Sequence, residues 1–75
     1  MKLNEVNIGD KVYIDGYTSM AQQNFGVRDV IDIKYKYDEG TGERYKVIVI
    51  NAGEFDSRTG ESLNKNSMYY IEPYK

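Results

Sequence analysis

Apolar and polar residues alternate along much of the chain with a period of two. No window of 11 residues keeps the apolar spacing of a helix, and seven glycines interrupt the chain repeatedly. A period of two is typical of strands that bury one face. The pattern therefore predicts an all-β protein, a small antiparallel barrel of five strands.

The expected strands are separated by polar and glycine-rich stretches. The first covers residues 11–15 and ends at Gly16, and two longer ones cover residues 27–37 and 44–52. Residues 54–55 fold back towards residues 62–63 as a short hairpin with little to bury. The last strand covers residues 67–72 and ends before Pro73, which has no N–H to donate to a ladder.

Residues 16–26 form a polar segment between the first two expected strands. Its only large apolar side chains are Tyr17, Met20 and Phe25. Three large side chains in so short a segment need a surface to pack against, which predicts an ordered loop. The segment is either a binding loop or a long connection.

An aromatic residue followed by Asp-x-x-Thr-Gly-Glu occurs twice, at residues 37–43 and 55–61. An Asp side chain can accept hydrogen bonds from the turn that follows it, and Gly tolerates a positive φ. Both copies are therefore expected to be hairpin loops. Their flanking sequences differ, which indicates a recurring turn rather than an ancient duplication.

The first of these turns fixes a register for the two long strands. A four-residue loop, residues 39–42, sets Asp38 opposite Glu43. Continuing outward, the register places Ile33 opposite Ile48 and Ile31 opposite Ile50, so that four β-branched side chains share one face. It also predicts two cation–aromatic pairs, Tyr35 with Lys46 and Tyr37 with Arg44. A loop of three or five residues would instead set Lys36 against Lys46.

The same register leaves Val30, Val47 and Val49 on the opposite face. Residues 47–50 are thus apolar on both sides, as in a central strand of a bent sheet with both faces covered. We expect barrel closure to cover this strip. The alternative is a strip that is open to a partner or to a second copy of the chain.

Composition limits the classes of function. A chain of 75 residues is expected to be one domain, and its charge of -2, from 10 basic and 12 acidic residues, argues against a surface made to hold phosphates. Cysteine and histidine are absent, which excludes thiol nucleophiles, imidazole bases and the usual zinc and haem ligands. The lack of cysteine favours a cytoplasmic location, and no run of 18 apolar residues predicts a membrane span.

The remaining motifs give little support to catalysis. The carboxylates of the two turns lack the alternating ligands of a calcium loop, and Gly40-Thr41-Gly42 lacks the Gly-Lys-Ser/Thr ending of a phosphate-binding loop. No motif activates a Ser, Thr or Lys nucleophile. We therefore expect no enzyme activity, no cofactor and no metal.

The order of elements resembles an SH3-like small β-barrel, and more loosely the KOW and Tudor-type members of that group. The residues that carry the resemblance are Ile8-Gly9-Asp10-Lys11-Val12-Tyr13-Ile14, residues 26–33 and the final segment 68–73. A Tudor-type aromatic cage would draw on Tyr13, Tyr17 and Phe25. As a small acidic chain rich in Tyr and Asn, the protein also resembles early accessory proteins of bacteriophages.

Tyrosine supplies 8 of the 10 aromatic residues, which suits either strand packing or an interface. We expect a non-enzymatic protein-interaction module, an accessory or inhibitory factor that binds a larger protein. The alternative is a nucleic-acid-binding barrel whose central hairpin offers cations for phosphates and rings for bases. The expected partner-binding residues are Tyr17, Phe25, Lys34, Tyr35, Lys36, Tyr37, Arg44, Tyr45, Lys46 and Val47.

Overall fold

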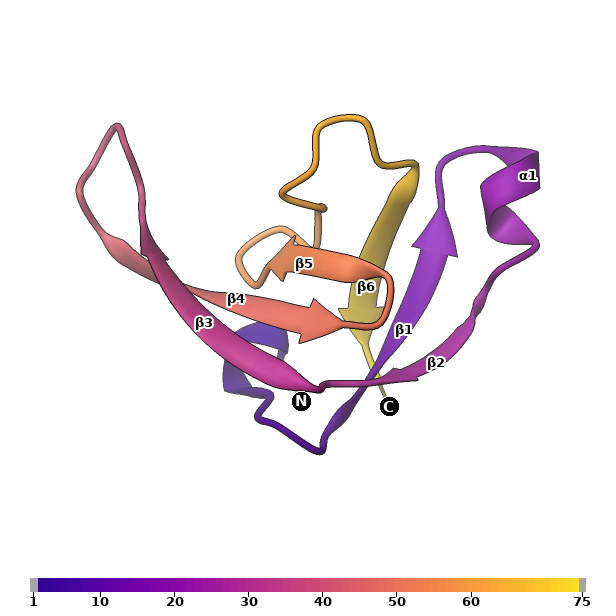
Figure 1. The fold of residues 1–75 in the computed structure, drawn as a ribbon, viewed down its shortest axis with the longest axis horizontal. Helices are drawn as coiled ribbons and strands as arrows, with labels where there is room; N and C mark the ends of the chain where they lie inside the picture. The colour runs from indigo at the N-terminus through magenta and orange to yellow at the C-terminus, as the bar shows by residue number, and fades with distance from the viewer. Residues whose placement is uncertain (1, 75) are drawn as a thin grey trace.

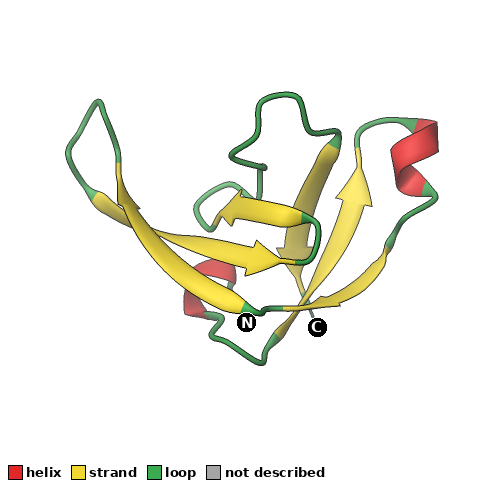
Figure 2. Ribbon diagram, viewed as in Figure 1, coloured by secondary structure: helices red, strands yellow, loops and turns green. Residues whose placement is uncertain are grey.

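The computed structural model describes residues 2–74 and is mostly β, with 47% strand and 10% helix (Figures 1 and 2). The helical elements are short: a 3-10 helix η1 (Leu3–Glu5) and α1 (Ser19–Gln22). Neither has the length or apolar character needed to cross a membrane. The strands are β1 (Lys11–Gly16), β2 (Gly26–Asp29), β3 (Asp32–Tyr37), β4 (Arg44–Ile50), β5 (Gly53–Asp56) and β6 (Tyr69–Pro73).

These strands form two antiparallel sheets of three strands each, in the orders β2-β1-β6 and β3-β4-β5. The all-β prediction is confirmed. The predicted count of five strands is wrong, because the described part of the chain has six, and neither sheet closes on itself.

The additional strand arises where the expected strand 27–37 changes partner. The N–H of Val30 donates to the carbonyl of Asp10 at 2.8 Å, whereas the N–H of Ile31 donates to the carbonyl of Val49 at 2.9 Å. One segment therefore pairs first with β1 and then with β4. The change of partner divides the segment into β2 and β3, which belong to different sheets.

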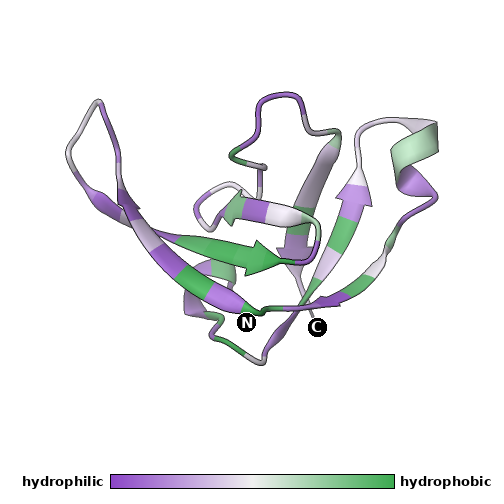
Figure 3. Ribbon diagram, in the orientation of Figure 1, coloured by the Kyte–Doolittle hydropathy of each residue, from purple (hydrophilic) through white to green (hydrophobic). Residues whose placement is uncertain are grey.

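One apolar core joins the two sheets. Along β1, Val12 and Ile14 are buried while Lys11 and Tyr13 lie on the other face, an alternation visible in Figure 3. Burying these side chains removes apolar surface from water, which is the main stabilising term for so small a domain. The core cluster consists of Val6, Val12, Ile14, Val30, Ile48, Ile50, Phe55 and Ile71.

Phe55 corrects the expectation that the second hairpin has little to bury. Its ring is fully buried and is the largest of the completely enclosed side chains. The hairpin itself is present: Phe55 bridges to Ser62, and the N–H of Leu63 donates to the carbonyl of Glu54 at 3.0 Å. This short element therefore supplies the largest single piece of the core.

The register predicted for the central hairpin is confirmed along its ladder. Tyr37 pairs with Arg44, Tyr35 with Lys46 and Ile33 with Ile48. The predicted cluster of four isoleucines is wrong at one position, because the side chain of Ile31 is 57% exposed. Ile31 lies at the change of partner before β3, so the strand's alternation does not direct it inward.

The apolar residues on the other side of β4 are also covered. Val30 and Val47 are buried and Val49 is half-buried. The strip is therefore not open, which contradicts its use for self-assembly and supports the expectation that both faces of this strand are covered.

The two Asp-x-x-Thr-Gly-Glu segments form the same kind of turn, with the main hydrogen bonds in common. In the first, Asp38 Oδ1 accepts from the N–H of Gly40 at 2.8 Å, and the Asp38 carbonyl accepts from the N–H of Gly42 at 2.8 Å. In the second, Asp56 accepts the equivalent bonds from Arg58 at 2.8 Å and Gly60 at 2.7 Å. The glycine has a positive φ in both, 73° and 82°. The turn prediction is confirmed.

Residues 16–26, expected to be a loop that packs on a surface, contain the short helix α1, which packs against β1. The hydroxyl oxygen of Thr18 caps this helix by accepting from the N–H of Ala21 at 3.1 Å. Ala21 is buried against Gly16, where any Cβ would overlap it. Of the large side chains in this segment, Tyr17 and Phe25 pack on other rings, whereas Met20 is 78% exposed.

Candidate partner-binding surface

The predicted binding residues fall into two separate places. Eight of them, within residues 34–47, lie on the β3–β4 hairpin, which we call the arm. The other two, Tyr17 and Phe25, flank α1. Figure 1 places the tip of the arm and α1 at opposite ends of the long axis of the molecule, which spans 36 Å. The ten residues therefore do not form one continuous site.

Most cations of the arm are engaged by the protein itself. Lys34 Nζ donates to Glu54 at 2.8 Å, and Lys36 Nζ lies 3.6 Å from the other oxygen of the same carboxylate. The hydrogen bond from Lys34 is the main reason that the pKa of Glu54 lies below its ordinary value. These two lysines thus balance an anion on β5, two strands away in the same sheet.

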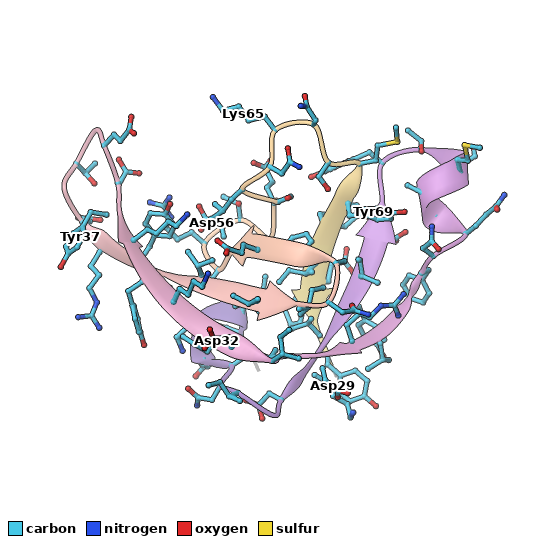
Figure 4. The ribbon with its side chains drawn as sticks, in the orientation of Figure 1. Asp29, Asp32, Tyr37, Asp56, Lys65 and Tyr69 are labelled. Atoms are coloured by element: carbon cyan, nitrogen blue, oxygen red, sulfur yellow. The ribbon has the colours of Figure 1, made fainter. Side chains whose placement is uncertain are left out.

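The cation–aromatic pairing on the arm differs from the prediction. The guanidinium of Arg44 lies 4.1 Å from the ring centre of Tyr35, diagonally across the ladder, and not over its direct partner Tyr37. Lys46 does not lie over a ring; its Nζ donates to the carbonyl of Val6 at 2.8 Å. The predicted register is confirmed, but neither cation contacts the tyrosine that lies directly opposite it in the ladder. Tyr37 is left 69% exposed near the tip (Figure 4).

Two more of the predicted residues are covered. Val47 is fully buried between Lys34 of β3 and Asp56 of β5, so a partner has no access to it. Tyr45 is half-buried, because the guanidinium of Arg58 lies 3.8 Å above its ring centre. The prediction that Val47 binds a partner is therefore wrong. One face of the Tyr45 ring is covered by Arg58 and is not accessible to a partner.

Arg58 ties the two repeated turns together. Its Nη1 donates to Asp38 Oδ2 at 2.9 Å, and its Nη2 donates to Asp56 Oδ2 at 2.8 Å. Asp56, labelled in Figure 4 at the end of β5, is buried, which opposes ionisation, but the bonds from Arg58 keep the pKa of Asp56 below its ordinary value. The hydrogen bond from Arg58 also lowers the pKa of Asp38, and the two carboxylates raise the pKa of Arg58. The cluster is a structural clamp.

Arg58→Gln is expected to destabilise the protein at neutral pH but hardly at all in strong acid. The folded-state pKa values of Asp38 and Asp56 lie below the ordinary 3.8, so their contribution is fully present above about pH 5. It is lost as the pH falls below 3.8 through the folded-state values. Urea unfolding of both proteins at several pH values between 2.5 and 7 measures the difference.

Arg44→Gln is the matched control for this experiment. Arg44 also lies over a tyrosine ring, but no carboxylate among the described residues is bonded to it. Its effect on the free energy of unfolding is expected to be the same across this pH range. A loss in Arg58→Gln that is equally independent of pH would contradict the clamp.

The outer face of the β2-β1-β6 sheet carries a cluster of exposed rings. Phe25 stacks on Tyr13 with the ring centres 5.7 Å apart and an interplanar angle of 14°. Tyr74 packs on the same Tyr13 ring at 5.1 Å. Phe25 is 56% exposed and Tyr74 41%, and the adjacent Val27, paired with Tyr13 in the ladder, is also exposed.

A second ring pair lies on the same face nearer α1, beyond the carboxylates Asp15 and Glu72, which the ladder places next to Tyr70 and Tyr13. Tyr17 packs on Tyr70 with 4.7 Å between ring centres, and Tyr17 is 60% exposed. The hydroxyl of Tyr70 donates to Asp15 at 3.3 Å. Partial burial and the negative charges of Asp15 and Glu72 raise the pKa of Tyr70. We call the whole surface the aromatic face; it comprises Tyr13, Tyr17, Phe25, Val27, Tyr70 and Tyr74.

Sequence reasoning found only part of the aromatic face. Tyr17 and Phe25 were among the predicted residues, whereas Val27, Tyr70 and Tyr74 were not. The signal was present in the alternation of the strands: Tyr70 and Tyr74 occupy positions that alternate with the buried Ile71. The alternation does not show which strand pairs with which, so it does not predict that β6 pairs with β1.

The SH3-like resemblance and the likeness to bacteriophage accessory proteins stay predictions. No protein-family model matches the chain, and no curated protein or solved structure is significantly similar to it.

Proposed function

We propose that the chain is a non-enzymatic protein-interaction module that binds a larger protein through the aromatic face. The observation that carries this proposal is the group of packed but exposed rings around Tyr13 and Tyr70. Aromatic side chains are enriched at interfaces because they bury a large area and lose little conformational entropy on binding. Rings that already pack on one another have even less freedom to lose.

The proposed architecture is an SH3-like barrel. Two three-stranded sheets that share one core, with the expected strand 27–37 passing from one sheet to the other, support it. In this arrangement the aromatic face lies on the side of β1 opposite the core. A partner bound there would leave the buried cluster intact.

The arm is a weaker candidate for the same role, and for binding nucleic acid. Lys34, Lys36 and Lys46 all contact groups within the chain, so a phosphate would have to compete with a carboxylate or a carbonyl for each of them. The hollow that lies between Lys36 and Lys65 is also lined by two carboxylates, Asp38 and Glu39. Binding that relies on phosphate neutralisation would be weakened by both features.

Capture of partners from a lysate tests the proposal. The double variant Phe25→Ala, Tyr74→Ala is expected to lose at least 30-fold in affinity for the captured partner, because truncating a central interface ring costs about 2 kcal/mol or more. Both side chains are exposed, so the variant should keep its fold; circular dichroism and a melting curve verify this. Affinity is then measured with the purified partner by calorimetry.

The double variant Tyr35→Ala, Tyr37→Ala is the matched control, with two exposed rings removed from the arm. It is expected to bind like the parent. Loss of binding in this variant alone would move the site to the arm. Retention of a single-stranded oligonucleotide at low salt, with affinity falling steeply as salt rises, would favour the nucleic-acid alternative.

A further inference from the structure

A small hollow lies on the inner side of the β2-β1-β6 sheet, lined by residues of these strands and of the turn between β4 and β5. Its volume is about 180 Å³. This is away from the aromatic face, because Ile14 points to the core side of β1. The residues that line it are Ile14, Asn24, Arg28, Asn51, Ala52 and Tyr69.

Arg28 differs from the other two arginines of the chain. Arg58 is bonded to two carboxylates, and Arg44 lies over a tyrosine ring. Within residues 2–74, Arg28 contacts neither a carboxylate nor a ring. Its Nη1 donates to the carbonyl of Val27 at 3.1 Å and its Nη2 to the carbonyl of Asn24 at 3.2 Å. The cation in this hollow therefore has no bonded anion.

The same two bonds fix the direction of the guanidinium. Each uses one N–H, and a guanidinium has five, so three N–H groups remain to donate. Gly26 supplies the space, because a Cβ at that position would lie 3.0 Å from Arg28 Nη1. The planar group is therefore held in place before any ligand arrives, which reduces the entropy lost on binding.

The other lining residues suit an anion that carries a small apolar group. Asn51 lies on the β4–β5 turn and offers an amide N–H₂, while Ala52 is exposed and provides an apolar contact above the buried Ile14. The amide of Asn24 is already oriented, since its Nδ2 donates to the hydroxyl of Tyr69 at 2.8 Å. No Asp or Glu side chain lines the hollow to repel a negative charge.

We propose that this hollow binds a carboxylate, held by the forked N–H groups of Arg28, with its small apolar substituent against Ala52. A planar carboxylate matches two parallel N–H groups of a guanidinium. The carboxylate is either a free small acid or the carboxyl end of a peptide, since both present the same group. This site is independent of the aromatic face and of the function proposed for it.

Titration of the ¹⁵N-labelled protein with N-acetylvaline and with N-acetylvalinamide tests the proposal. The two probes have the same side chain and differ in the carboxylate. N-acetylvaline is expected to shift the amides of residues 24, 28, 51 and 69 in a saturable way. Its affinity should exceed that of acetate several-fold through its side chain, and the amide probe should bind at least tenfold more weakly.

Variants assign the binding to Arg28. Arg28→Gln is expected to abolish the saturable shifts, and Arg28→Lys to weaken binding about tenfold, because an ammonium keeps the charge but not the fork. Asn51→Ala, on an exposed turn, gives a folded variant with a smaller loss if Arg28→Gln unfolds. Arg44→Gln on the arm should bind like the parent.

The outcomes separate the sources of the carboxylate. A hexapeptide that ends in a free valine carboxylate and binds more tightly than N-acetylvaline identifies a chain end, whereas equal affinity identifies a small acid. Equal binding of the carboxylate and amide probes, or unchanged binding by Arg28→Gln, would overturn the proposal. Shifts spread over the surface without saturation would also overturn it.

Discussion

Gly60→Ala is expected to lower the free energy of unfolding by about 3 kcal/mol or more, a large part of the stability of a domain of this size. Two costs combine at this position. The φ of Gly60 is +82°, which costs an L-residue about 1–2 kcal/mol. A Cβ there would also overlap the carbonyl oxygen of Ile71. The atom that this Cβ would meet belongs to the main chain of β6, so no side chain can move aside. The N–H of Ile71 donates to the carbonyl of Gly60 at 2.8 Å, which holds the two main chains together.

The repeated turn provides an internal control for this prediction. Gly42 occupies the same position in the first copy, with φ +73°, but nothing lies within 4 Å of the place its Cβ would take. Gly42→Ala should therefore show the conformational cost alone, about 1–2 kcal/mol. Urea unfolding of both variants, followed by circular dichroism, measures the difference. Equal losses would mean that close packing between the second turn and β6 contributes nothing.

This comparison also shows why the sequence predicts the local elements better than their assembly. The bonds of each turn are made within six residues, so Asp38 and Gly42 are sufficient to predict the first one. The proximity of Gly60 to Ile71 depends on where β6 lies. The glycines of two matching motifs therefore have different energetic roles, and only the tertiary structure distinguishes them.

The same reasoning explains the errors in the strands. The register of β3 and β4 follows from one short loop and was predicted correctly at Ile33, Tyr35 and Tyr37. The division of residues 27–37 was missed, because apolar alternation records burial and not the identity of the pairing strand. Val30 is buried, as its pattern indicates, although the segments before and after it pair with different sheets.

Only part of the candidate site is predicted from the sequence, because long-range contacts decide which side chains stay free. Composition indicates tyrosine-rich surfaces, and Tyr17 and Phe25 stand out as large side chains in a polar segment. The alternation of cations and rings, as at Lys34, Tyr35 and Lys36, points to the arm. Sequence alone does not reveal that Glu54, on a strand two places away in the sheet, engages both lysines. Long-range ion pairs thus make the lysines of the arm less available to a partner. Phe25 packs on Tyr13 but stays largely exposed, so it remains available within a cluster of rings.

Phe55→Ala is expected to cost about 3–5 kcal/mol, the range for truncating an enclosed phenylalanine. The ring of Phe55 is completely buried in the core cluster that joins the two sheets, alongside Ile48, its partner in the ladder. Removing it leaves a cavity that β5, a strand of four residues, cannot readily fill by moving. Thermal and urea unfolding measure the loss.

The chain's only other phenylalanine is the matched control. Phe25→Ala deletes the same atoms from a side chain that is 56% exposed, and it should cost less than about 1 kcal/mol. If Phe55→Ala is too unstable to fold, Phe55→Leu, which keeps most of the volume, should fold with a loss of about 1 kcal/mol. Similar losses for Phe55→Ala and Phe25→Ala would mean that the core is not centred on the second hairpin. The aromatic face would then be part of the folding core and not a surface free for a partner.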